Sequence, residues 1–344
     1  MKRISLVFFI PILLAACNNS RKGPDVSGIK MEIAIERFDQ QFFAVDTMAP
    51  GKSLAELQKK YPSLMPVFMQ NILGLTDSSA DSGIRRFIRL NQFIADSVNN
   101  VFDNTTGLKK DFEQAFRYVK YYFPNYKIPR IITIIGPVDV LAETTTGDLT
   151  PDFLGQDFLG ISLQFYLGKD FSLYKDDYFV ANVAPAYRSR RFDKKYMVAD
   201  AMKLIVDDIF PDRSKGKGLI EQMIEKGKQW WLLDKFLPSS PDSLKTGYTQ
   251  DQLDWCYENE GLIWNSIITN EKNIYTTNPA AIQNYIGEAP FTQTMPAASP
   301  GNIGQWVGWQ IVKKYAEKNS SLSIEEVMKT EPRKILEEAK YKPK

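Results

Sequence analysis

The chain has 344 residues, of which 44% are hydrophobic and 24% charged, a composition typical of a globular protein with a full core. It contains no histidine, which excludes a Ser-His-Asp triad, a Cys-His pair and a metal site with histidine ligands. The net charge of +2 comes from Lys2 and Arg3, and without them 41 basic residues balance 41 acidic ones. This balance argues against a nucleic-acid-binding protein.

Residues 1–16 have the pattern of a bacterial signal peptide. Lys2 and Arg3 precede an apolar run that is too short to cross a bilayer as a helix. The sequence Leu14-Ala-Ala-Cys17 resembles a lipobox, which implies lipidation of the Cys17 thiol, cleavage before Cys17 and acylation of the new amino group. Several acyl chains would anchor the protein stably. The alternatives are an ordinary secretory signal and an N-terminal anchor helix that is retained.

The segment after the lipobox predicts a flexible tether. Residues 17–30 are polar and contain Gly, Pro and Ser, which favour an extended linker over a packed element. After residue 30 no apolar run reaches membrane-spanning length. We therefore expect residues 31–344 to form a single α-rich globular domain that hangs from one membrane leaflet.

The first half of this domain mixes helices with a few strands. Residues 31–45 begin with strand-like alternation and end in a short helix. Two short helices, interrupted at Pro62 and Pro66, are expected over 52–73, and longer ones over 84–102 and 107–123. Strands are expected over 130–135 and 158–167, with Gly- and Thr-rich turns between them.

From about residue 186 the pattern becomes helical. The expected helices are 193–210, 216–236, 249–272, 302–318, 323–329 and 331–340. Thr249 to Gln252 and Ser323 to Glu326 have the spacing of capping boxes at helix N-termini. The fold class expected is α+β, predominantly α-helical, with a small β-sheet in the first half.

Three aspartates in the turn region are candidates for the ligands of a metal site. Asp148, Asp152 and Asp157 are separated by four and five residues, a spacing that does not fit a calcium loop. We therefore expect solvated turn carboxylates here, and no metal site.

A second acidic pair lies on one helix face. Glu221 and Glu225 are four residues apart, so a helix places them side by side. Such a pair can perform acid–base chemistry or bind a metal. The same spacing fits a solvated face beside Lys226 and Lys228.

The densest group of aromatic and acidic residues spans 248–264. It contains Trp255, Glu258, Glu260 and Trp264. One interpretation is a helix that packs its rings into the core, and the other is a groove that holds a partner. Between these residues, Cys256 has no histidine or local cluster of cations to activate it, so a buried structural thiol is expected.

Residues 299–312 are glycine-rich and then helical. Gly304 and Gly308 are four apart, beside Trp306 and Trp309. Because glycine within a helix costs about 1 kcal/mol relative to alanine, a packing reason is expected. Small residues at this spacing predict close approach of another helix.

Several segments, spread in order over nearly the whole mature chain, together match one family. They are Ile35–Asp39 with Phe42 and Phe43, Asp152–Gly168, Leu232–Pro238 with Gly247–Thr249, Trp255–Glu260 with Ile263 and Trp264, Ala289–Thr292, Ser299–Val312 and Tyr341–Pro343. In these segments and in its lipobox the sequence resembles the gliding-motility lipoproteins of the GldB type. The resemblance implies an envelope lipoprotein with partners in the gliding machinery and its associated secretion system. We expect it to lie at the outer membrane and to face the periplasm. The family carries no settled catalytic motif, so the resemblance assigns no active-site residue.

The order of elements is also similar to zinc peptidases of the HExxH class. The corresponding helix would lie at about 194–210, and it holds no histidine. Glu221 or Glu225 could then be relics of a downstream ligand position. This likeness implies a degenerate zincin-like domain that has kept the fold without the catalyst.

The sequence thus favours a non-catalytic envelope protein that needs no cofactor or metal. It would be held at the membrane by its N-terminal lipid and would serve as a scaffold or assembly factor. One alternative is a hydrolase whose carboxylates come from Glu221 with Glu225, or from Glu258 with Glu260. The other is a module that binds cell wall or lipid through residues 248–264.

Overall fold

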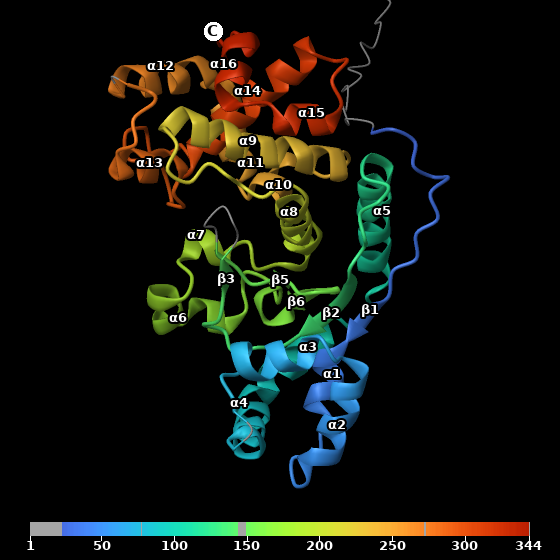
Figure 1. Cartoon of the computed structure of the whole chain (residues 1–344). Coiled ribbons are helices and arrows are strands. Elements are labelled where there is room, and N and C mark those ends of the chain that lie inside the picture. Colours follow the sequence, from blue (N-terminus) through green and yellow to red (C-terminus); the bar gives the residue numbers. More distant parts are fainter. Residues whose placement is uncertain (1–22, 77, 144–148, 272, 344) are drawn as a thin grey trace, which may run out of the picture.

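The computed structural model describes residues 23–76, 78–143, 149–271 and 273–343. The predicted signal peptide, Cys17 and Asp148 lie outside these residues. A small sheet occupies the middle of the molecule, with α1 to α4 below it and the helices from α9 onward above it (Figure 1). This arrangement confirms the predicted α+β class, mostly helical, with the sheet in the first half.

The sheet has four strands in the order β1-β2-β6-β5. Their bounds are β1 Ile35–Arg37, β2 Arg130–Ile134, β6 Phe158–Ser162 and β5 Phe153–Leu154. The first three are parallel, and β5 pairs antiparallel with β6. The strand predicted over 158–167 ends at Ser162 and turns into a 3-10 helix over 163–165. A separate pair, β3 Ala142–Glu143 and β4 Leu149–Thr150, has no counterpart in the sequence prediction.

Successive side chains of β2 point to opposite faces of the sheet, and each face has its own hydrophobic core. Ile132 and Ile134 pack with Phe158 against the helices below the sheet, whereas Ile131 packs into the larger core above it. The lower helices are α1 Phe38–Phe43, α2 Pro50–Lys60, α3 Leu64–Pro66 and α4 Ala80–Val101.

Of the two predicted proline interruptions, only the one at Pro62 is present. Helix α2 ends at Lys60, before Pro62. Pro66 instead lies within α3, which continues directly into a π-helix over Val67–Ile72. Pro66 is tolerated because the first turn of a helix leaves its N–H groups unpaired, so a missing donor costs nothing there.

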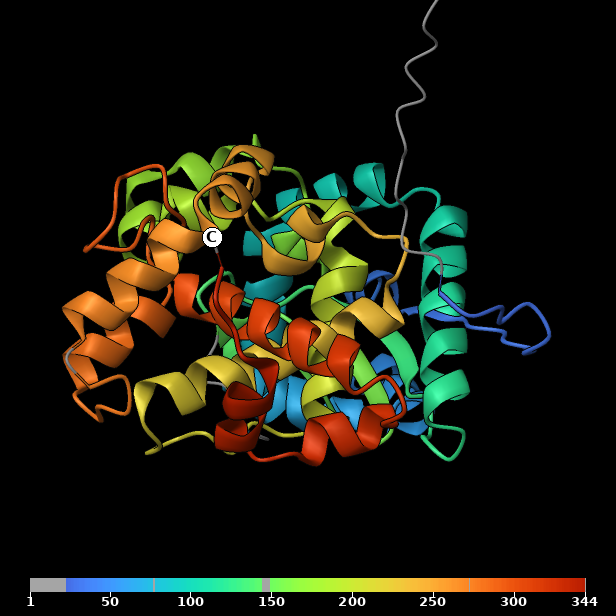
Figure 2. The ribbon, with the colours of Figure 1, turned by 90° about the horizontal axis from the view of Figure 1, so that it is seen from above.

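The upper layer is built from the C-terminal half of the chain. Its helices are α8 Met197–Ile209, α9 Leu219–Phe236, α10 Asp242–Thr246, α11 Gln250–Glu258, α12 Glu260–Asn270, α13 Pro279–Ile286, α14 Ile303–Lys318, α15 Ile324–Lys329 and α16 Pro332–Ala339. Seen from above, the orange and red C-terminal helices cover much of this side (Figure 2). Helices α5 Thr106–Tyr122, α6 Asp177–Asn182 and α7 Ala186–Ser189 flank the sheet. Both predicted capping boxes are present, but the single helix predicted over 249–272 is divided at Asn259.

The upper layer is organised around the crossing of α9 and α14. A Cβ on Gly227 of α9 would lie 2.1 Å from the carbonyl carbon of Gly308, and one on Gly308 would lie 1.7 Å from Met223 O. The two backbones are therefore in contact, which explains the glycines. Trp306 and Trp309 beside them are buried, which confirms the predicted packing role of this segment.

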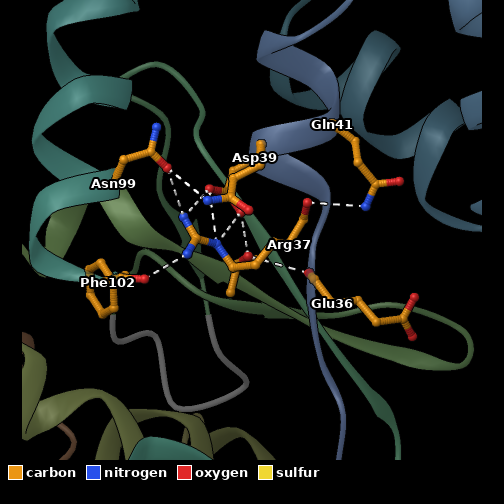
Figure 3. Close-up of polar contacts among 8 residues, drawn as sticks. Glu36, Arg37, Asp39, Gln41, Asn99 and Phe102 are labelled. Carbon is orange, nitrogen blue, oxygen red and sulfur yellow. Dashed lines mark hydrogen bonds and ion pairs between the residues drawn. The ribbon is translucent and has the colours of Figure 1, made fainter. Parts of the chain in front are cut away.

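A charged residue pair fixes the junction between β1 and α1. The Arg37 guanidinium pairs with buried Asp39 at 2.7 Å and donates through Nη1 to Phe102 O at 2.8 Å (Figure 3). Thr133 Oγ1 of β2 donates to Asp39 Oδ1 at 2.5 Å, which ties the helix start to the central strand. This pair lies in the first of the segments that resemble the GldB type.

The start of the described chain packs against the domain. The segment before β1 runs along the outer side of α5 (Figures 1 and 2). Val26 is buried, and Arg117 of α5 donates through Nε to Ile29 O at 3.1 Å. The described part of the predicted tether, residues 23–30, therefore contacts the domain. Among the described helices, none has the length and apolarity that crossing a bilayer requires.

Candidate functional site

A partly enclosed cavity of about 150 Å³ lies where the sheet region meets the helices above it. Its charged walls come from α7 and the residues after it, from α8, from α9 and from the loop after α13. The charged residues are Arg188, Arg191, Asp200, Lys203, Asp207, Lys226 and Glu288. Apolar contact comes from Phe192, Leu204, Val206 and Trp230. A pocket that combines apolar walls with a few converging polar groups is the usual form of a ligand site.

Two arginines on one wall share a single carboxylate. Arg188 donates through Nε to Glu288 Oε2 at 2.9 Å, and its Nη2 reaches the same oxygen. Arg191 donates through Nη2 to the other oxygen, Oε1. Although burial alone would raise the pKa of Glu288, the two guanidinium groups outweigh it and hold that pKa below its usual value. Glu288 is therefore ionised at neutral pH.

The charges of α8 and α9 on the other walls are also engaged. Lys203 donates to Asp200 Oδ1 at 2.8 Å, three residues away on the same helix. Asp207 and Lys226 each have an interaction partner as well, and Lys226 is only 6% exposed. Helix α8 corresponds to the helix to which the zinc-peptidase likeness pointed. The charged side chains that it offers to the cavity are one lysine and two aspartates.

Asp152 corrects one sequence expectation, because it is fully buried and not solvated. It accepts hydrogen bonds from Ser162 N at 2.9 Å and from the Tyr166 hydroxyl at 2.6 Å. Burial raises the pKa of Asp152 to about 7. Tyr166 lines the cavity and its hydroxyl is bonded to Asp152, so this carboxyl supports a cavity wall. Asp157, by contrast, is half-exposed and 3.7 Å from Arg130, as a surface turn carboxylate would be.

The glycine-rich segment 299–312 forms part of the same cavity. Asn302, which precedes α14, has a φ of 45°, and its carbonyl accepts a hydrogen bond from the Tyr248 hydroxyl at 3.2 Å. Asn302 and Gln305 both line the cavity. A residue other than glycine in the left-handed region carries backbone strain, and such residues concentrate at functional sites.

Glu221 and Glu225 do not line this cavity, and each has a structural partner. Glu221 accepts from the backbone N–H of Gly218 at 3.0 Å, capping α9, and from Arg333 Nε at 2.9 Å. The hydrogen bond from Arg333 lowers the pKa of Glu221. Glu225 accepts from Lys228 Nζ at 3.2 Å, with Lys217 Nζ at 3.6 Å.

The aromatic group 248–264 is divided between two helices. Glu260 and Trp264 of α12 meet at one C-terminal residue: the Tyr341 hydroxyl donates to Glu260 Oε1 at 2.7 Å, and the Trp264 and Tyr341 rings are 5.3 Å apart. Trp255 is half-buried on α11, and Glu258 is exposed at its end. The structure therefore brings Glu260 and Trp264 together at Tyr341, whereas Trp255 and Glu258 belong to the preceding helix. Because both tryptophans are only partly buried, a role in partner contact stays a prediction.

Two further expectations concern thiol and metal chemistry. Cys256 is fully buried, as predicted, and burial raises the pKa of its thiol. Within the described ranges, no group of three or more Cys, Asp and Glu side chains is arranged to hold a metal ion.

Sequence reasoning did not single out Arg188, Arg191 and Glu288. The run Tyr187-Arg-Ser-Arg-Arg191 was a visible signal, but its partner lies about 100 residues later, after α13. The chemistry available at this cavity is recognition of an anionic group by guanidinium donors, since Glu288 and Asp200, two of its three carboxylates, are held in ion pairs.

Comparison with known proteins places the chain in a family. The family model for the gliding motility protein GldB matches residues 19–343, and the chain belongs to this family. Membership implies a part in gliding motility and association with the cell envelope. No curated protein and no solved structure matches the chain.

Proposed function

We propose that this protein is a lipid-anchored component of the bacterial cell envelope that supports gliding motility and the associated secretion machinery as a non-catalytic scaffold or assembly factor. Lipidated Cys17 would hold it at the outer membrane, facing the periplasm. The observation that carries the proposal is the family match over residues 19–343, which begins two residues after the last residue of the lipobox Leu14-Ala-Ala-Cys17. Partners would be proteins of the motility and secretion apparatus.

The charges of the described residues support a non-catalytic role. The sequence offers no histidine for proton transfer. Of the candidate glutamate pairs, Glu221 and Glu225 are occupied by a helix cap and by ion pairs. Glu288 is held ionised by two arginines. A carboxylate with a lowered pKa is a poor general acid near neutral pH.

The anchor is tested by replacing the chromosomal gene with a Cys17→Ala variant. We expect this variant to lose fatty acylation in metabolic labelling, to leave the membrane fraction and to impair gliding and secretion. The matched control is Cys256→Ala, which changes the other cysteine and should remain acylated and membrane-bound. Continued acylation and membrane retention of Cys17→Ala would refute the anchor.

The non-catalytic role is tested with Glu221, Glu225, Glu258 and Glu260 changed together to Gln. Glutamine keeps the shape of each side chain and removes its ability to transfer a proton. We expect gliding and secretion to persist at normal protein levels. Loss of both activities, with the variant folded and present at wild-type amounts, would favour the envelope hydrolase instead.

The scaffold role itself requires stable protein partners. Crosslinking in intact cells, followed by purification of the lipidated protein, should recover motility or secretion components. The Cys17→Ala variant serves as the control, because it should recover fewer of them. Recovery of the same components in equal amounts by both proteins would show that anchoring does not direct assembly.

A further inference from the structure

The cavity bounded by α7, α8 and α9 carries more positive than negative charge. Four cationic side chains face three acidic ones, which leaves a surplus of one positive charge. The cations are Arg188, Arg191, Lys203 and Lys226, and the acids are Asp200, Asp207 and Glu288. Charge interactions are stronger in a partly enclosed site than in water, so an anion is the natural balance for this surplus.

The two arginines are the donors best placed to bind an anion. Arg188 and Arg191 share the one carboxylate of Glu288, so two positive charges meet a single negative one. A guanidinium group has five N–H donors, and only some of these are used on Glu288. The remaining donors have no acceptor among the residues that the structure describes. Because both side chains line the cavity, these donors are available to a second oxyanion.

The size and the other walls of the cavity restrict the rest of the ligand. Its volume of about 150 Å³ equals that of an engineered protein cavity that accepts benzene. Leu204 and Trp230, both more than nine-tenths buried, offer apolar contact. The space suits an anionic group attached to a short apolar body.

We propose that this cavity binds a small organic carboxylate, whose oxygens pair with Arg188 and Arg191 beside Glu288 and whose apolar part contacts Leu204 and Trp230. Glu288 shows that these arginines accept a carboxylate, and fork-shaped guanidinium donors fit that group well. The ligand could be a free small carboxylate or the terminal carboxylate of a polypeptide, since the chemistry of recognition is the same.

The test uses sodium benzoate as the probe and calorimetric titration of the full mature protein in detergent. We expect saturable binding to the wild type. In Glu288→Gln the competing carboxylate is removed, so the affinity for benzoate should rise about tenfold, equivalent to about 1.4 kcal/mol. Benzoate should also raise the melting temperature of this variant more than that of the wild type. If Glu288 had only a structural role, neither effect on benzoate binding would be expected.

Arg191→Gln should weaken benzoate binding about tenfold, because it removes the surplus charge. The matched control is Arg333→Gln, an exposed arginine that also pairs with a glutamate but lies away from the cavity. Its affinity should equal that of the wild type. If Arg191→Gln does not fold, Leu204→Phe replaces it: this change fills the cavity without altering charge and should abolish binding.

The proposal is overturned if neither the wild type nor Glu288→Gln binds benzoate, or if Leu204→Phe binds it as the wild type does. The source of the carboxylate is separated with the tripeptide Gly-Gly-Phe. Competition with benzoate by the free acid, and none by its C-terminal amide, assigns a polypeptide terminus. Failure of both forms to compete, with benzoate bound, assigns a free small carboxylate.

Discussion

Gly227 of α9 and Gly308 of α14 contact each other backbone to backbone, with 2.1 Å between an ideal Cβ on Gly227 and the Gly308 carbonyl carbon. This contact sets the distance between two helices that both contribute to the charged cavity, α9 through Lys226 and α14 through Gln305. The spacing of the helices and the shape of the cavity thus depend on the same pair of residues.

We expect Gly308→Ala to be strongly destabilising, because its Cβ would lie 1.7 Å from Met223 O and the helices would have to move apart. Overpacking of this kind costs about 1–3 kcal/mol or more. Urea denaturation followed by circular dichroism measures the loss. The matched control is Gly107→Ala in α5, where nothing lies within 4 Å; it should leave stability unchanged or raise it by up to about 1 kcal/mol. Equal effects of the two changes would contradict this account of the crossing.

Asp234→Ala should also lower the stability of the folded protein. Asp234 accepts from the Trp309 indole N–H at 2.8 Å and pairs with Lys245, which is only 2% exposed. Although Asp242 also contacts Lys245, the variant would leave a buried cation without its closest partner, at a cost of about 3–5 kcal/mol. Thermal denaturation checks this.

The comparison variant for Asp234 is Asp170→Ala, whose ion pair with Lys175 is well exposed. Solvent screens an exposed pair strongly, so the melting temperature should change little. A small effect of Asp234→Ala, similar to that of Asp170→Ala, would show that the buried pair does not stabilise the fold.

Asp152 should make stability fall as pH rises. Its pKa is raised from 3.8 to about 7 by burial, so the folded protein keeps a proton that the unfolded chain releases near pH 4. The contribution of this residue is therefore complete below about pH 4 and is lost as pH rises to about 7. Asp152→Asn cannot ionise, so its stability relative to the wild type should improve across this window, by about 1.4 kcal/mol per pKa unit at most. Urea denaturation at a series of pH values measures it, and a difference independent of pH would contradict the prediction.

The Cys256 thiol should be inert in the native protein. It is fully buried, and burial raises the pKa of the thiol, so little thiolate is present or accessible. A maleimide probe at pH 7 should label the mature lipidated protein only after guanidinium denaturation. Rapid labelling of Cys256 under native conditions would show that α11 opens locally.

Local signals were sufficient for the long elements of the fold. The apolar repeat predicts a helix over 107–123, and α5 spans Thr106–Tyr122. The run after Arg130 gives a strand, because β-branched residues bounded by Gly136 and Pro137 favour one. Short elements such as α13 and the β3–β4 pair were missed, since they depend on tertiary packing more than on periodicity.

Long-range partners could not be predicted from the sequence. Asp152 reads as a turn carboxylate, yet Ser162 and Tyr166, ten and fourteen residues later, make a buried position possible. Glu221 and Glu225 share a face as predicted, but Arg333 and Lys217 determine that the face is structural. The Arg188–Glu288 pair joins residues that no local pattern connects.

The position of Gly23 leaves no room for a side chain, because a Cβ there would lie 2.8 Å from both Tyr118 and Pro238. Gly23 is thus packed against the folded body, and it lies six residues after Cys17 in the sequence. Six residues reach at most about 20 Å when fully extended, less than the thickness of a bilayer. With Cys17 acylated as proposed, Gly23 would lie no farther than this from the lipid surface. An insertion between Cys17 and Gly23 would increase this reach, and with it the distance from the membrane at which the folded body can meet a partner.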